Sequence, residues 1–286
     1  YPQDDALLEM CDKLGMLAWE EIPIIDIVPD TPGYAENCEN NLREMIRQHY
    51  NHPSIITWGY MNEILLVTQR RYKKEEELKP VLERTLSLAN RLEKVLKEED
   101  STRVSTMAFH GSNSYNEVGL GNITDIVGWN LYQGWYGGDL TGFERFLTEQ
   151  HKKRPSHPMI VSEYGAGSDK RLHSLQPHAF DFSIEYQQKY LEHYLPILEE
   201  TPYICGCVMN LCRASTIKDW YTQTAVQKTC TITIKPPGVK TFPCYTLPAV
   251  TGRTVAVYNM ERLRFRYPLR YIPIFRKWNS SLTENP

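Results

Sequence analysis

The feature that most constrains the fold is a regular alternation, from residue 4 to residue 208, of helix-periodic segments with short β-rich runs. Residues 4–15 place apolar side chains at helical spacing and stop at Gly15, and residues 74–99 form a long charged helical pattern. Residues 54–60 (SIITWGY) and 159–163 (MIVSE) are typical of buried strands. The other predicted helices are 41–49, 143–153 and 182–199, and the other predicted strands are 16–22, 103–109, 125–131 and 203–208.

Strands that alternate with helices in this way indicate βαβ units and a parallel sheet. We count about six candidate strands, whereas a closed (β/α)₈ barrel requires eight. The predicted fold class is therefore α/β, as a partial TIM barrel. Residues 1–208 would form this incomplete barrel.

Composition excludes several other classes of protein. The net charge of −3 over 286 residues gives no reason to expect a nucleic acid or an anionic membrane as partner. No apolar run is long enough to cross a bilayer, and no signal-peptide pattern precedes Tyr1, so the compartment stays open between cytoplasm and periplasm. Seven scattered cysteines, an odd number, do not read as a disulfide framework. The Cys205-x-Cys207 pair has no companion at zinc-site spacing.

Two glutamates stand where a parallel barrel places its chemistry. Glu63 and Glu163 each lie at or just past the end of a predicted strand, and such ends meet on one rim of a barrel. Glycosidic hydrolysis uses a proton donor for the leaving oxygen and a carboxylate on the opposite side of the anomeric carbon. Spacing alone makes this pair one hypothesis among several, because any α/β protein has other carboxylates at strand ends.

The residues around the two glutamates are more specific. The string HPSIITWGYMNE (52–63) resembles the acid/base strand of glycoside hydrolase family 2, the β-galactosidase and β-glucuronidase family. PMIVSEYGAGS (158–168) resembles the nucleophile strand of that family, and GWNLYQGWYGG (128–138) resembles the segment between them. The match runs from residue 1 to about residue 207 in the family's order and spacing. The resemblance also implies that the barrel's first two strands are lacking, because Tyr1-Pro2 resembles the end of the His-Tyr-Pro segment that follows the family's second strand.

The resemblance implies a role for four residues. Glu63 would be the general acid/base and Glu163 the nucleophile of a retaining enzyme. Asn62 would hydrogen-bond the sugar 2-hydroxyl, and Tyr132 would orient Glu163. Because the acid must keep a proton while the nucleophile stays ionised, their surroundings must separate two chemically identical groups.

Three further residues are candidates for substrate binding. Trp135 would offer a sugar-stacking face, with structural packing as an equal alternative. His110 follows a predicted strand and would line the pocket, unless it is a structural histidine. Glu21 ends the early strand and would touch substrate or cap the rim. Some β-galactosidases of the family hold magnesium through a Glu-x-His at this place, but this chain reads Glu21-Ile22-Pro23, so we expect no metal and no cofactor.

The resemblance stops near residue 209, and residues 209–286 are rich in Thr, Lys, Arg and Pro. Regrouping the codons by one nucleotide, with permitted synonymous codons, lets residues 215–238 begin INNKGLVY, which resembles the family's own sequence after strand eight. Residues from 271 onward can likewise be regrouped into family-like sequence. We interpret this tail as frameshifted between residues 207 and 214, and predict poor order and no partner for its apparent strands, such as TCTITIK. The basic, aromatic run ERLRFRYPLRYIPIFRKW then indicates no nucleic-acid surface.

The favoured function is retaining exo-hydrolysis of a terminal β-linked sugar, with a galactoside or related oligosaccharide first as substrate. Glucuronides and mannosides are the alternatives within the family, and the segment 128–138 argues against an endo-glucanase. An inactive truncated and frameshifted fragment is the rival from another class, because an open parallel sheet leaves two edges unpaired. The sequence leaves the oligomeric state open.

Overall fold

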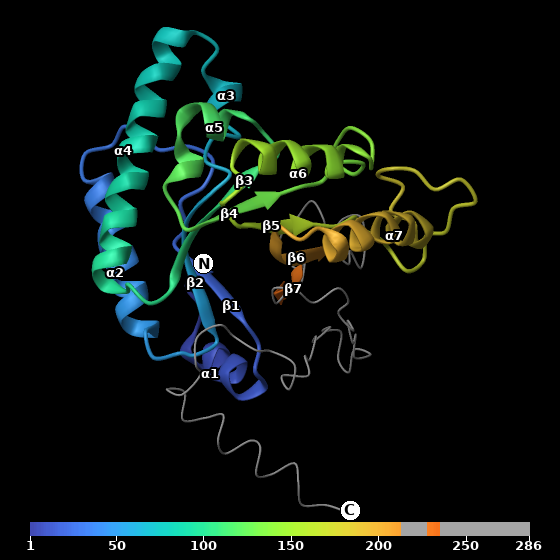
Figure 1. The fold of residues 1–286 in the computed structure, drawn as a ribbon, viewed down its shortest axis with the longest axis horizontal. Coiled ribbons are helices and arrows are strands. Elements are labelled where there is room, and N and C mark those ends of the chain that lie inside the picture. The colour runs from blue at the N-terminus through green and yellow to red at the C-terminus, as the bar shows by residue number, and fades with distance from the viewer. Residues whose placement is uncertain (213–227, 235–286) are drawn as a thin grey trace, which may run out of the picture.

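The computed structural model describes residues 1–212 and 228–234. Its strands form one sheet whose order follows the chain, from β1 to β7 (Figure 1). The strands are β1 Ala18–Glu21, β2 Ile55–Asn62, β3 Val104–His110, β4 Ile126–Asn130, β5 Met159–Tyr164, β6 Ile204–Cys212 and β7 Lys228–Ile234.

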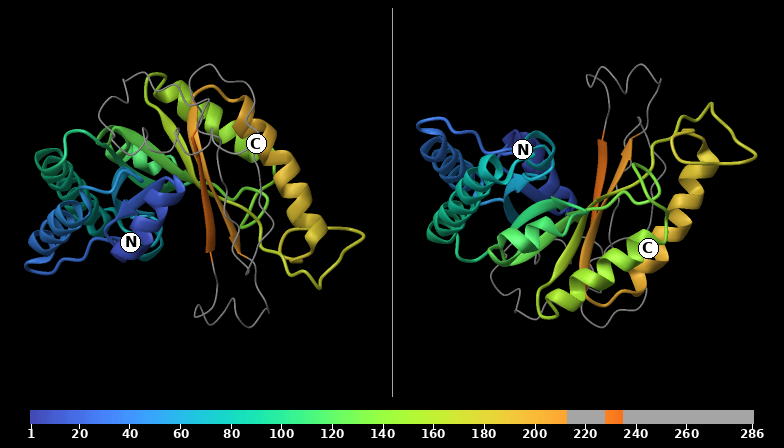
Figure 2. Two further views of the ribbon diagram at one scale, coloured as in Figure 1. Left: turned by 90° about the horizontal axis from the view of Figure 1, so that it is seen from below. Right: turned by 90° about the horizontal axis from the view of Figure 1, so that it is seen from above.

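The strands β1 to β6 pair in parallel, each with its neighbour along the chain. Figures 1 and 2 show the sheet curling, with helices α2, α4, α6 and α7 on its outer side. A curled sheet of six parallel strands with helices outside is part of a TIM barrel, as the sequence predicts. Among the described residues, β1 and β7 are the two edges of the sheet.

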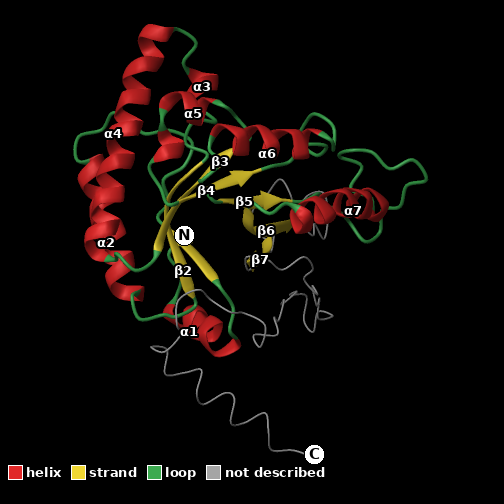
Figure 3. Cartoon of the chain, viewed as in Figure 1, coloured by secondary structure: helices red, strands yellow, loops and turns green. Residues whose placement is uncertain are grey.

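Along the chain the helices alternate with the strands, and Figure 3 draws them in red around the yellow sheet. Capping explains the first of them: the Asp4 side chain accepts the Ala6 N–H at the start, and Gly15 ends the helix with φ +67°. The predicted helices are confirmed, although α2 begins earlier than expected, after Gly33. The helices are α1 Asp5–Leu14, α2 Tyr34–His49, α3 Thr68–Arg71, α4 Glu75–Glu99, α5 Ser114–Val118, α6 Gly142–Lys153 and α7 Ile184–Glu200. None in the described part is long and apolar enough to span a membrane.

Side chains alternate between the two faces of each strand, and their partners show which face is which. On β2, the Trp58 indole donates to Asp100 at the end of α4, and the Tyr60 hydroxyl donates to Glu93 on α4. Both side chains therefore point outward to the helices. Gly59 lies between them and faces the interior, where an added Cβ would come within 2.6 Å of the Trp19 indole nitrogen.

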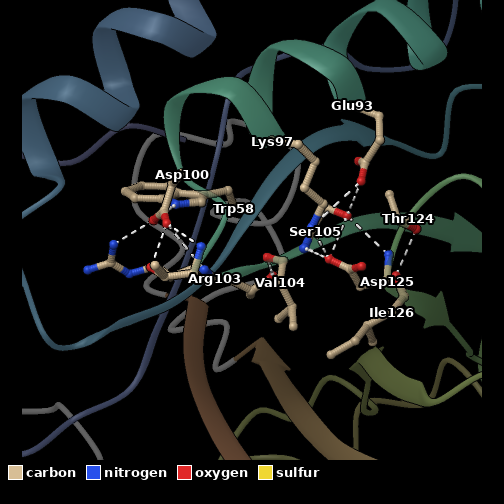
Figure 4. A network of polar contacts seen from close by, with 12 residues as sticks. Trp58, Glu93, Lys97, Asp100, Arg103, Val104, Ser105, Thr124, Asp125 and Ile126 are labelled. Carbon is tan, nitrogen blue, oxygen red and sulfur yellow. Dashed lines mark hydrogen bonds and ion pairs between the residues drawn. The ribbon is translucent and has the colours of Figure 1, made fainter.

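The amino-terminal ends of β3 and β4 carry a network of charged groups (Figure 4). Asp100 accepts from the Arg103 guanidinium at 2.7 Å and from the Trp58 indole at 3.0 Å. Alongside, Ser105 donates to Glu93 at 2.8 Å, and its backbone N–H donates to Asp125 at 2.8 Å. This end of the sheet is thus tied to α4 by hydrogen bonds and ion pairs.

The carboxyl-terminal part corrects one prediction. The segment expected to lack a partner, TCTITIK, overlaps β7, which pairs antiparallel with β6 from Gly206↔Ile234 to Cys212↔Lys228. Alternating Thr and Ile have high β propensity, and β6 offers a sheet edge for them to extend. The frameshift between residues 207 and 214 concerns the encoding DNA and stays an interpretation. The rest of the tail for which poor order is predicted, residues 213–227 and 235–286, lies outside the described residues.

Candidate functional site

The candidate site lies at the carboxyl ends of β2, β4 and β5, opposite the charged network of Figure 4. Glu63 follows β2 directly, and its N–H donates to the Ala108 carbonyl of β3 at 2.8 Å. Its φ of +48° is in the left-handed region, which L residues with a Cβ seldom occupy. Such backbone strain is concentrated at functional sites, where the surrounding structure holds it in place.

Asn130, the last residue of β4, connects Glu63 to the rest of the rim. Its Nδ2 donates to Glu63 Oε1 at 3.0 Å and to Asn62 Oδ1 at 3.1 Å. Its Oδ1 accepts the Ser162 hydroxyl at 2.7 Å. Only 3% of Asn130 is exposed, so this one carboxamide joins β2 to β5 across the interior.

Glu163 lies beside this group on β5. It is the Cα partner of Asn130 in the sheet register, and its carbonyl accepts the Leu131 N–H at 2.8 Å. The Tyr132 hydroxyl donates to Glu163 Oε2 at 2.6 Å. The structure therefore gathers Asn62, Glu63, Tyr132 and Glu163 at one rim.

Glu21 and Glu20 point to opposite faces of β1. Glu20 lies outside, where its carboxylate contacts His49 Nδ1 at 2.9 Å. Glu21 lies inside, where its Oε2 accepts the Trp19 indole N–H at 3.1 Å. Burial raises the pKa of Glu21; the N-terminal ammonium and Trp19 lower it, and the charge of Glu163 raises it again. Glu21 thus adds a third carboxyl group to the interior near Glu163.

Trp19 occupies the barrel interior beneath this rim. A Cβ at Gly128 on β4 would lie 2.7 Å from Trp19 Cη2, and a Cβ at Gly59 on β2 would lie 2.6 Å from its Nε1. Neither contact is compatible with a side chain, so both glycines leave room for one indole. The indole in turn holds Glu21, which ties the packing of the interior to the geometry of the site.

His110 ends β3 and is the register partner of Asn130. Its Nδ1 lies 2.7 Å from the Tyr115 hydroxyl, which itself accepts the Leu65 N–H at 3.3 Å. Burial, with a smaller contribution from the Arg70 charge, lowers the pKa of His110 to about 4. The imidazole is neutral at physiological pH.

Trp135 requires a correction to the sugar-stacking prediction. Only 3% of it is exposed, and its ring packs among Phe180 at 4.8 Å, Phe182 at 5.2 Å and Tyr186 at 5.9 Å. A ring enclosed in this way has no free face for a sugar, so the packing alternative applies. The neighbouring Tyr136 is 56% exposed, with its ring 4.8 Å from that of Tyr132.

Sequence reasoning missed Asn130, Ser162 and Trp19 as parts of the site. Asn130 and Ser162 belong to the matched strings, but their importance depends on hydrogen bonds between strands far apart in sequence. The alternation of side chains between the two faces of a strand could have indicated both residues, because each takes an inward-facing position near the end of its strand. Within residues 1–212 and 228–234, no three His, Cys, Asp or Glu side chains are grouped so as to hold a metal ion.

Known proteins resemble this chain in sequence and fold. A β-glucuronidase from Bacteroides fragilis is 36% identical over 175 residues, which are 59% of this chain and 22% of that protein. The Mus musculus β-glucuronidase is 29% identical over 209 residues, 70% of this chain and 29% of that protein. These names favour the glucuronide alternative over the galactoside expected first.

Among solved structures, Bacteroides uniformis β-glucuronidase 2, covalently bound to cyclophellitol-6-carboxylate aziridine, is 87% identical with a TM-score of 0.71. The match covers 73% of this chain and 25% of that one, so the chain spans about a quarter of the relative's length. Residues 1–209 match the family model described as "Glycosyl hydrolases family 2, TIM barrel domain". The chain belongs to family 2 of the glycosyl hydrolases.

Proposed function

We propose that this chain carries the catalytic carboxyl groups of a retaining β-glucuronidase, with Glu163 as nucleophile and Glu63 as general acid/base. The observation that carries the proposal is the shared anchoring of the two groups. Asn130 donates to Glu63, and Tyr132, two residues further along, donates to Glu163. One short segment thus orients both carboxyls at one rim of a parallel barrel, where such enzymes place their chemistry.

The proposed reaction has two steps. In the first, the Glu163 carboxylate attacks the anomeric carbon while Glu63 transfers its proton to the leaving oxygen, and the aglycone departs. In the second, the Glu63 carboxylate takes a proton from water, and the water oxygen displaces Glu163 from the sugar. The enzyme returns to its starting protonation state, and the sugar keeps its β configuration.

The neighbouring groups support these roles. Tyr132 holds Glu163 Oε2 at 2.6 Å, which restricts rotation of the carboxylate before attack. Asn62, whose Oδ1 is occupied by Asn130, is left with its N–H₂ group for the sugar 2-hydroxyl. His110 is neutral and adds no positive charge to the rim.

A glucuronide is the proposed substrate because the named relatives are β-glucuronidases. Because the chain spans about a quarter of such a relative's length, the relative's activity does not stand for that of this chain, and the assay must use this chain itself. Turnover of nitrophenyl β-D-glucuronide should exceed that of the β-D-galactoside by about 10⁴-fold or more, the discrimination expected when a site is built to bind one polar group of its substrate. Glu163→Gln should reduce the glucuronide rate to background.

The outcomes separate the competing readings. Preference for the galactoside would contradict the substrate assignment while keeping the family chemistry. Equal rates for this chain and its Glu163→Gln variant would support the inactive-fragment hypothesis. Glu83, an exposed ion-pair residue on α4, provides the matched control, because Glu83→Gln should leave the rate unchanged.

A further inference from the structure

When Glu63 is ionised, the hydrogen bonds around Asn130 have only one consistent arrangement. Nδ2 faces two acceptor oxygens, Asn62 Oδ1 and Glu63 Oε1, and an amide nitrogen has two protons to give. Oδ1 faces the Ser162 hydroxyl, which can donate. Rotating the carboxamide by 180° would set its oxygen against two other oxygens at about these distances, without hydrogens between them when Glu63 is ionised. The carboxamide is therefore fixed in orientation.

This orientation has a consequence for each neighbour. Because an amide N–H only donates, Glu63 Oε1 serves as an acceptor, and as long as this arrangement is kept a proton taken up by Glu63 goes to Oε2. Because Asn62 Oδ1 accepts from Asn130, the Asn62 amide is also fixed, with its N–H₂ group directed away from that contact. Ser162, 7% exposed and adjacent to Glu163 in sequence, donates to Asn130 Oδ1 in this arrangement and so helps to hold the carboxamide in place.

We propose that Asn130, oriented by Ser162, is a positioning residue that selects Oε2 of Glu63 as the proton-carrying oxygen and turns the Asn62 amide toward the substrate. The bonds run from Ser162 through Asn130 to Asn62 and Glu63, and so couple the strand that bears Glu163 to the residue expected to protonate the leaving group. The catalytic meaning of this network rests on the proposed function, whereas its hydrogen bonds do not.

The first test is independent of turnover. In the chain labelled with ¹³C at glutamate carboxyls, the Glu63 resonance is identified by its loss in Glu63→Gln and followed through a pH titration. Asn130→Asp replaces a donor with a like charge and should raise the Glu63 titration midpoint by at least about one pH unit. Asn130→Ala should raise it less, because it only removes a donor, and Ser162→Ala should raise it least.

Thr106→Ala is the matched control, since Thr106 is a buried hydroxyl residue on β3 whose Oγ1 has no hydrogen-bond partner among the described residues. Its Glu63 midpoint should equal that of the unmodified chain. An unchanged midpoint in Asn130→Asp, with circular dichroism showing an intact fold, would overturn the proposal. Ser162→Ala, the mildest change, keeps the test decisive if the Asn130 variants fail to fold.

The second test addresses Asn62. Removal of the substrate 2-hydroxyl should lower kcat/KM strongly for the unmodified chain and by at least about tenfold less for Asn130→Ala, because the mutant amide is no longer held for that hydroxyl. Equal losses in both would contradict the role assigned to Asn62. If no glucuronide is turned over, the proposed function fails, but the titration still decides whether Asn130 positions Glu63.

Discussion

The two ends of the parallel sheet both contain buried carboxyl groups, but their surroundings shift the pKa values of these groups in opposite directions. At the amino-terminal end, Asp100 is paired with Arg103 and receives N–H groups from Trp58 and Thr102. These hydrogen bonds outweigh burial and hold the pKa of Asp100 well below its ordinary value. At the other end, burial dominates: the pKa of Glu21 is raised and that of His110 falls to about 4.

The two ends therefore differ in how easily their carboxyl groups change protonation state. A carboxylate that is fully paired contributes to stability in its charged form, while one facing few cations is more easily protonated and deprotonated. The network of Figure 4 thus holds β3 and β4 to α4, and the opposite rim supplies groups suited to proton transfer. Four substitutions or conditions test this comparison.

The largest expected effect is at the amino-terminal end. Asp100→Ala leaves the Arg103 guanidinium, 16% exposed, without its carboxylate, and should lower the free energy of unfolding by about 3 kcal/mol or more. Urea denaturation measures this loss. The exposed pair of Lys79 and Glu83 on α4 is the control, and Glu83→Ala should leave the urea midpoint nearly unchanged. Equal midpoints for both variants would refute the structural role of Asp100.

The next effect concerns the packing that supports the rim. Gly128→Ala places a Cβ 2.7 Å from Trp19 Cη2 and 2.9 Å from Ser162 Oγ, and should cost about 1–3 kcal/mol of unfolding free energy. Gly137→Ala, where a Cβ meets nothing within 4 Å, should cost much less. Combining Gly128→Ala with Trp19→Phe should restore part of the loss. If the double variant loses the sum of the unfolding free energies lost by Gly128→Ala and Trp19→Phe alone, Gly128 does not accommodate the indole.

A third effect follows from pH. In the folded chain, burial would raise the pKa of Asp100, but hydrogen bonds from Thr102, Trp58 and Arg103 lower it. Burial likewise opposes the lowered pKa of Asp125, which hydrogen bonds from Lys97 and Ser105 produce. Their stabilisation is present above the unfolded pKa of about 3.9 and is lost as pH falls through the folded values. The unfolding free energy should therefore decrease below about pH 4, and Asp100→Asn should flatten that decrease. An unaltered acid limb in the variant would contradict the assignment.

The smallest effect is at the carboxyl-terminal rim and has the opposite sign. Because burial raises the pKa of Glu21, its contribution to stability is present below the unfolded value and lost as pH rises through the folded value. Glu21→Gln keeps a neutral side chain and should raise the unfolding free energy at pH 7 by on the order of 1 kcal/mol, with no gain at pH 4. A loss at pH 7 would show that charged Glu21 is stabilising.

Much of the fold could be predicted from the sequence because its long elements have strong local signals. The capped helix α1 and the charged helix α4 were found close to their observed bounds. Short helices such as α3 and α5 were missed, since one turn has too few residues for a period. The pairing of β7 was predicted wrongly because the sequence shows a strand's propensity but not which sheet edge is open.

The placement of a candidate site residue could be predicted where it belongs to a contiguous string of residues that resembles the family. Asn62, Glu63, Tyr132 and Glu163 belong to contiguous strings, and the structure brings them together. The burial of Trp135 depends on Phe180 and Tyr186, which come from a distant loop and helix. The bridge made by Asn130 depends on the register between β4 and β5 and on the bulge near their ends. Neither can be read from local sequence.

The central claim, that Glu163 is the nucleophile of a glucuronide site, is tested most directly by covalent labelling with cyclophellitol-6-carboxylate aziridine. Attack by a carboxylate on this ring forms an ester, which mass spectrometry can locate on a peptide. We predict one adduct per chain, on Glu163, absent in Glu163→Gln and formed more slowly in Glu63→Gln, which lacks the proton donor for the aziridine nitrogen. An adduct on another residue, or undiminished labelling of Glu163→Gln, would contradict the account.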